Sequence, residues 1–143
     1  MGGRKIGPLA EPYLNKTPRF PDSGSSAGSF QRMETAVVFP VLPGKSEALI
    51  AFANACMHER HDEYKASQAS IKEESWYLQS TPMGDLCIVI FEAPDPAAVF
   101  NGLAESQEPF DVWFRQQVLD TTGADLTKPP SSFPTRIFRW ESE

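Results

Sequence analysis

Residues 33–143 alternate between short stretches with apolar residues on both faces of an extended chain and longer stretches with helical spacing of apolar residues. The short stretches at 35–39, 76–80, 86–91 and 135–140 have the length and the β-branched and aromatic content of strands. Residues 86–91 contain no polar side chain, which indicates that this strand is buried on both faces. The pattern therefore predicts four strands.

The intervening segments predict helices. A long helix is expected over 46–71, because this segment contains neither Gly nor Pro. An Asp-Pro pair predicts the start of a short helix over 96–104. A Glu-Pro pair precedes a further helix over 110–122, which Gly123 is expected to end.

The resulting order is βαββαβ, which is that of a ferredoxin-like α+β domain with a four-stranded antiparallel sheet and helices on one face. The turn 82–85, Pro-Met-Gly-Asp, makes the two middle strands a hairpin. The two helical segments can cover only one face of the sheet, whereas the strands are apolar on both faces. We therefore expect the second face, whichever of the two it is, to meet a second copy and form a homodimer.

The first 32 residues differ from the rest of the chain. They are rich in Gly and Pro and include the stretch Ser-Gly-Ser-Ser-Ala-Gly-Ser. Such a composition buries too little apolar surface to offset its conformational entropy. We predict a flexible or arm-like extension over 1–32, followed by one domain over 33–143. Met33 directly precedes the first strand and is an alternative start of the chain.

The charge is unevenly distributed. The net charge is −6, with +3 on residues 1–32 and −9 on residues 33–143. So acidic a domain is not expected to bind nucleic acid, because phosphate contacts need clustered basic residues. The sequence has no apolar run long enough for a membrane span and no secretory signal, so a cytoplasmic location without membrane contact is expected. Cys56 and Cys87 are interpreted as small buried hydrophobic residues.

Parts of the chain resemble a known group of proteins. The first strand, the hairpin 76–91 and the segments 108–115 (Glu-Pro-Phe-Asp-Val-Trp-Phe-Arg) and 122–126 (Thr-Gly-Ala-Asp-Leu) resemble the dimeric α+β barrel superfamily, and within it a small bacterial family of unknown function. The resemblance covers about 33–143. It implies a homodimer in which two sheets face each other, and it supplies no catalytic motif.

One helix carries the main candidate site. On a wheel at 100° per residue, Arg60 and Glu63 fall within the apolar face of the helix 46–71. A charged pair in this position needs a physical reason, because buried charge is costly. One interpretation is a structural salt bridge with its stems along the apolar face. The other is a pocket between helix and sheet, where Arg60 binds an anionic group and Glu63 acts as a base or orients another group.

Further candidates come from the same helix and from the aromatic residues. His58 and His61 are three residues apart, which is not the i, i+4 spacing of a helical zinc site, so no metal is expected. His61 could reach the rim of a pocket. Tyr64, Trp76 and Trp113 could line an aromatic cavity or belong to the core. The sequence has none of the glycine-rich nucleotide-binding motifs, and no cofactor is expected.

Three functions remain open. The chain could bind a small molecule between helices and sheet as a homodimer. It could be an enzyme similar to the cofactor-independent monooxygenases or isomerases of the superfamily, with Arg60 polarising an oxygen, Glu63 taking a proton, and Trp76 and Trp113 enclosing the substrate. It could also be an interaction domain without catalysis, because Val112 and Leu119 form a second apolar stripe on the helix 110–122.

Overall fold

A computed structural model describes residues 33–142, and residues 33–134 form one compact unit. Residues 135–142 belong to a separate unit. The N-terminal extension predicted over 1–32 lies outside the described residues.

The compact unit contains a three-stranded antiparallel sheet. Strands β2 (Met33–Pro40) and β3 (Glu73–Thr81) lie on either side of β4 (Gly84–Ala93). Val89, in the middle of β4, pairs with Val37 on β2 and with Trp76 on β3. Three of the predicted strands and the hairpin are therefore confirmed, and their order is the one that a ferredoxin-like domain requires of them.

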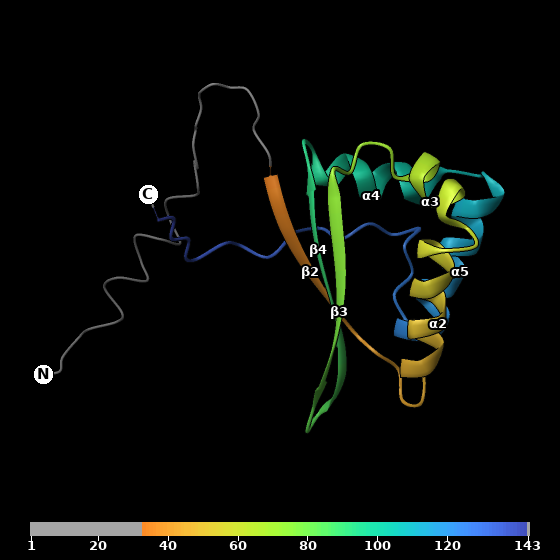
Figure 1. Cartoon of the computed structure of the whole chain (residues 1–143), viewed down its shortest axis with the longest axis horizontal. Coiled ribbons are helices and arrows are strands. Elements are labelled where there is room, and N and C mark those ends of the chain that lie inside the picture. Colours follow the sequence, from red (N-terminus) through yellow and green to blue (C-terminus); the bar gives the residue numbers. More distant parts are fainter. Residues whose placement is uncertain (1–32, 143) are drawn as a thin grey trace, which may run out of the picture. The chain divides into compact units, whose positions relative to one another are not determined.

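Four helices lie together on one side of this sheet (Figure 1). They are α2 (Ser46–Met57), α3 (His61–Ser67), α4 (Pro96–Glu105) and α5 (Pro109–Thr122). The α+β class and the placement of the helices on one face are thus confirmed for the compact unit.

Local signals in the sequence account for the start of α4 and the end of α5. The side chain of Asp95 accepts a hydrogen bond from the backbone N–H of Ala98 at 3.2 Å, and Pro96 occupies the first turn of α4. Gly123 ends α5 in the left-handed conformation, with φ of 81°. The second apolar stripe of α5, formed by Val112 and Leu119, is exposed in the described chain.

The long helix predicted over 46–71 is wrong as a single element. The chain leaves helical geometry at His58 and resumes it at His61, and the N–H of Arg60 reaches back five residues to the carbonyl of Ala55 at 2.8 Å. No Gly or Pro marks this break, so the pattern did not reveal it. Because the break shifts the phase of the helix, the single wheel fails beyond it, and Arg60 and Glu63 do not lie in the core.

The predicted fourth strand is also absent from the described structure. Residues 135–142 form no strand, and Ile137, Phe138 and Trp140 are each more than 70% exposed. The segment has the composition of a strand, but a strand requires a partner edge for its backbone hydrogen bonds. The described part of the sheet is therefore three-stranded.

The two faces of the sheet differ in what covers them. Cys87, Val89, Phe91 and Ala93 of β4 are buried on the face that the helices cover. The alternate positions of the strands form the open face, which no helix of residues 33–134 covers (Figure 1). We define this open face by Ala36, Val38, Ser75, Tyr77, Leu86, Ile88 and Ile90.

Candidate functional site

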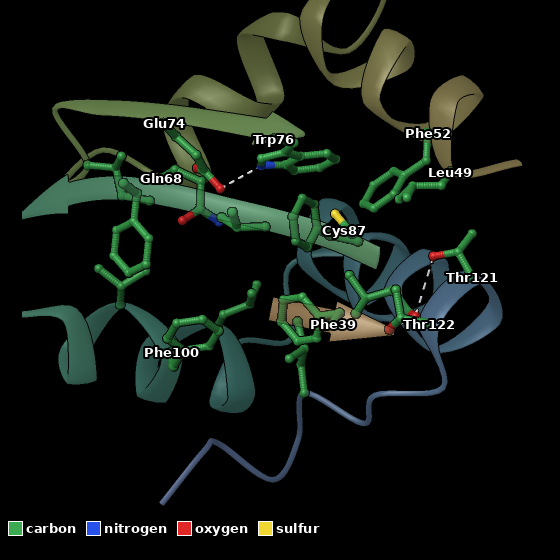
Figure 2. A pocket seen from close by; sticks show the side chains of 18 residues that line it. Phe39, Leu49, Phe52, Gln68, Glu74, Trp76, Cys87, Phe100, Thr121 and Thr122 are labelled. Atoms are coloured by element: carbon green, nitrogen blue, oxygen red, sulfur yellow. Dashed lines mark hydrogen bonds between the residues drawn. The ribbon is translucent and has the colours of Figure 1, made fainter. Parts of the chain in front are cut away.

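A cavity lies between the sheet and the helices, within the compact unit (Figure 2). Its volume is about 60 Å³. All three strands and helices α2, α4 and α5 contribute to its walls, which are mostly apolar. The principal lining side chains are those of Phe39, Phe52, Trp76, Cys87, Phe100 and Phe114.

Aromatic packing holds one wall of this cavity in place. The ring centre of Phe52 on α2 lies 5.2 Å from the ring centre of Trp76 on β3 and 5.0 Å from that of Phe114 on α5. Both pairs are inclined rather than stacked flat, with interplanar angles of 53° and 67°. Such tilted contacts are favourable for aromatic rings. The three elements are thus joined at the cavity wall by one cluster.

Glu74 is the acidic side chain of this wall. Strand alternation places it on the same face as Trp76, two residues further along β3, and opposite Phe91 of β4. One carboxylate oxygen accepts a hydrogen bond from the indole N–H of Trp76 at 2.7 Å, and the other accepts one from the hydroxyl of Tyr64. Figure 2 shows the carboxylate of Glu74 turned toward the indole of Trp76.

The electrostatics of Glu74 follow from its burial. Desolvation raises the pKa of its carboxyl group, and the hydrogen bonds from Tyr64 and Trp76 oppose this effect only in part. No ion pair among the described residues includes Glu74. The carboxyl group therefore lies in an apolar wall with two neutral donors and without a described cationic partner.

The charge of Glu74 raises the pKa of three other groups, Cys56, Cys87 and Tyr64. Burial raises the pKa of the Cys56 thiol to about 12 and raises that of Cys87 as well, and the negative charge of Glu74 adds to both shifts. The same two causes raise the pKa of Tyr64. These groups consequently stay neutral at physiological pH, and both cysteines are free.

The predicted pair of Arg60 and Glu63 lies outside the cavity wall. Two hydrogen bonds of 2.8 and 3.2 Å join the guanidinium to the carboxylate. This pairing lowers the pKa of Glu63 and raises that of Arg60. The guanidinium also lies 4.1 Å from the ring centre of Trp113, a cation–π geometry. The arrangement is that of a surface ion pair resting on an aromatic side chain.

Of the other four predicted site residues, two lie at the candidate site and two do not. Trp76 lines the cavity and Tyr64 contacts Glu74, so these two belong to the candidate site. Trp113 packs edge-on against Phe52 and carries Arg60. His61 is exposed, with Nδ1 3.5 Å from a carboxylate oxygen of Asp62. Trp113 and His61 are thus not brought to the cavity.

Sequence reasoning missed Glu74 and Gln68, the polar residues on the sheet and α3 sides of the wall. The predicted strand began at Trp76, whereas β3 begins at Glu73. Extending the alternation back by two residues places a carboxylate on the core face, and that conflict was the available signal. Gln68 follows the unpredicted helix break, so its direction could not be derived.

Within 33–142, no three His, Cys, Asp or Glu side chains are grouped as a metal site would need. No helix in the same range is long and apolar enough to cross a membrane.

The fold and site together define an α+β protein with a mostly apolar cavity between its sheet and its helices and one carboxyl group in the cavity wall. No protein-family model, curated protein or solved structure matches the chain. The resemblance to dimeric α+β barrel proteins therefore stays a prediction.

Proposed function

We propose that the chain binds a small, mainly apolar molecule in the cavity between helices and sheet. The observation that carries this proposal is the position of Glu74. A carboxyl group in an apolar wall costs free energy that an apolar side chain at the same position would avoid. Such a group in a cavity is therefore a candidate for ligand binding.

The volume of the cavity limits the ligand. A cavity that holds one water molecule needs roughly 10–15 Å³. The cavity of about 60 Å³ thus accepts a group of about five non-hydrogen atoms. Short-chain molecules such as n-butanol are suitable probes, and a larger ligand would need its wall to move.

A pair of variants on α5 tests the proposal. Val118 lines the cavity, whereas Val112 lies on the exposed side of the same helix. We expect Val118→Phe to fill the cavity and abolish the amide shifts that n-butanol causes in nitrogen–proton NMR spectra of the full chain. Val112→Phe should leave them intact. Overpacking destabilises a core by about 1–3 kcal/mol, so the spectrum of each variant must first show a folded domain. Equal n-butanol shifts in both variants would refute the cavity as the binding site.

We further propose that the protein is a homodimer in which two open faces pack together. Val38 and Tyr77 on this face are 49% and 55% exposed, and the central positions between them are apolar. Glu34, Glu92 and Glu73 pair across the strands in one row at one end of the face. A two-fold axis can set apolar centres together and acidic ends apart, which favours a second copy as the occupant.

In this dimer, residues 135–140 are proposed to supply the fourth strand. Their apolar residues are exposed in the described chain, and β2 lies at an edge of the three-stranded sheet. An exposed strand edge is a template for pairing, and strand addition covers both the edge and the apolar side chains. The four-stranded sheet and the barrel belong to this proposal.

Catalysis is the second candidate function. A carboxyl group whose pKa is raised by burial is a candidate for proton transfer as a general acid or base. An enzyme of the cofactor-independent type would use Glu74 as its acid or base, rather than Glu63, which is bound to Arg60 on the surface. Turnover of an enolisable substrate that is lost in Glu74→Gln and retained in Glu63→Gln would support this function.

A further inference from the structure

We propose that the ligand of this cavity is an apolar amine, whose protonated nitrogen is received by Glu74 and the surrounding aromatic rings. This inference rests on the proposed function and adds the chemical class of the ligand.

The carboxylate of Glu74 has hydrogen-bonding capacity that the described contacts do not use. Two oxygens of an ionised carboxyl group together accept about four hydrogen bonds. Glu74 uses one site on each oxygen, for Trp76 and Tyr64. Both donors are neutral, and no described ion pair includes Glu74. An ammonium group supplies both the missing donors and the missing charge.

The walls of the cavity are rich in aromatic side chains. Trp76, Phe39 and Phe100 are among the aromatic side chains that line the cavity. The faces of aromatic rings attract cations, most strongly where water is excluded. Trp76 contributes in two ways, because its N–H fixes the carboxylate while its ring forms part of the wall. Aromatic walls around one carboxylate favour a cation over a neutral group.

The charges of the described residues around the cavity disfavour an anionic ligand. Among the described residues, Glu74 raises the pKa of Tyr64 on α3, of Cys56 on α2 and of Cys87 on β4, and none of these three groups is a cation. The cation Arg60 acts only weakly in this region, where it opposes the raised pKa of Cys56 as the smallest of the causes. Arg60, the residue expected from sequence to bind an anion, is held by Glu63 and lies over Trp113. An anion in the cavity would therefore meet the charge of Glu74 without compensation.

The test compares two ligands of equal size in the full chain. n-Butylamine, protonated at pH 7.5, and n-butanol both have five non-hydrogen atoms. We expect n-butylamine to bind the wild-type protein about tenfold more tightly in NMR titrations, because a charge-assisted hydrogen bond is stronger than a neutral one. Glu74→Gln should remove this preference and leave n-butanol binding in place.

Glu73→Gln is the matched control, since Glu73 is the next residue on β3, exposed on the other face of the sheet. It removes the same charge and should retain the preference for the amine. A preference that survives in Glu74→Gln, or that disappears in Glu73→Gln, would assign the amine to the acidic surface and overturn the inference.

Two other outcomes separate this inference from the proposed function. If n-butanol binds as tightly as the amine and Val118→Phe abolishes it, the cavity is a binding site but the amine inference is wrong. If neither probe binds, both the amine inference and the proposed binding function are wrong. Should Glu74→Gln not fold, the amine must be lost in Val118→Phe and kept in Val112→Phe, and any other result overturns the inference.

Discussion

Glu74 gives the stability of the fold a defined dependence on pH. Because burial raises its pKa above the ordinary value of 4.5, the folded state binds this proton more tightly than the unfolded state does. Its contribution to stability is fully present below pH 4.5. It is lost as the pH rises through the elevated pKa of the folded state.

The variant Glu74→Gln should reveal this effect. Glutamine can keep contacts to Tyr64 and Trp76 but has no charge, so its stability relative to the wild type should rise between pH 4 and pH 8. Each unit of pKa difference corresponds to about 1.4 kcal/mol in the free energy of unfolding. Urea unfolding at several pH values measures it, with Glu73→Gln as the charge-matched control. A difference that does not change with pH would contradict the assignment.

At the scale of single residues, the sequence predicted part of the site. Trp76 and Tyr64 were recognised as aromatic candidates, and both lie at the site. Arg60 and Glu63 were predicted on one face of an unbroken helix, and the break after Met57 removed the basis of that prediction. The ion pair itself forms, in agreement with the alternative of a structural salt bridge.

At the scale of elements, the predictions succeeded where Gly, Pro or Asp residues mark the start or the end of an element. The turn before Gly84, the start of α4 at Asp95 and the end of α5 at Gly123 were readable because each residue has a distinct conformational preference. The break between α2 and α3 has no such residue. Helix propensity is a weak guide in such a segment, because tertiary context can override it, so the break could not be derived from the residue types.

Two glycines test whether a helix end needs glycine for its backbone conformation. Gly123 has φ of 81°, and a β-carbon there would lie 3.4 Å from a side-chain atom of Leu42. We expect Gly123→Ala to lower the free energy of unfolding by about 1 kcal/mol. Gly102 lies inside α4, where a β-carbon would meet nothing within 4 Å, so Gly102→Ala should raise it by about 0.5–1 kcal/mol. Urea unfolding measures both, and equal effects of the same sign would contradict this account.

At the scale of the whole molecule, the open face is the feature that the sequence indicated and the compact unit leaves uncovered. Burial of apolar residues on both faces of β4 was expected from its uninterrupted apolar pattern. The sequence could not say which face would meet the helices, because both are apolar. The structure assigns Val37 and Val89 to the helix side and leaves Val38 and Ile88 on the other.

The proposed homodimer therefore predicts a specific effect at Val38. An aspartate there would place a charge at the centre of the interface, and we expect Val38→Asp to weaken the dimer by about 100-fold or more. Met83→Asp is the control, because Met83 is 92% exposed in the hairpin turn. Sedimentation at several concentrations measures both variants. A wild-type protein that stays monomeric at micromolar concentration, or a Val38→Asp variant that still dimerises as the wild type does, would exclude this interface.

The position of Trp76 also has an optical consequence. Its indole lines the cavity and donates its N–H to Glu74, whereas Trp113 carries Arg60 and Trp140 is largely exposed in the separate segment 135–142. The wavelength of indole emission depends on the polarity around the ring. Phe substitutions at Trp113 and Trp140 would leave Trp76 as the single tryptophan of the chain. The emission wavelength of Trp76 would then report the entry of a molecule into the cavity without any added label.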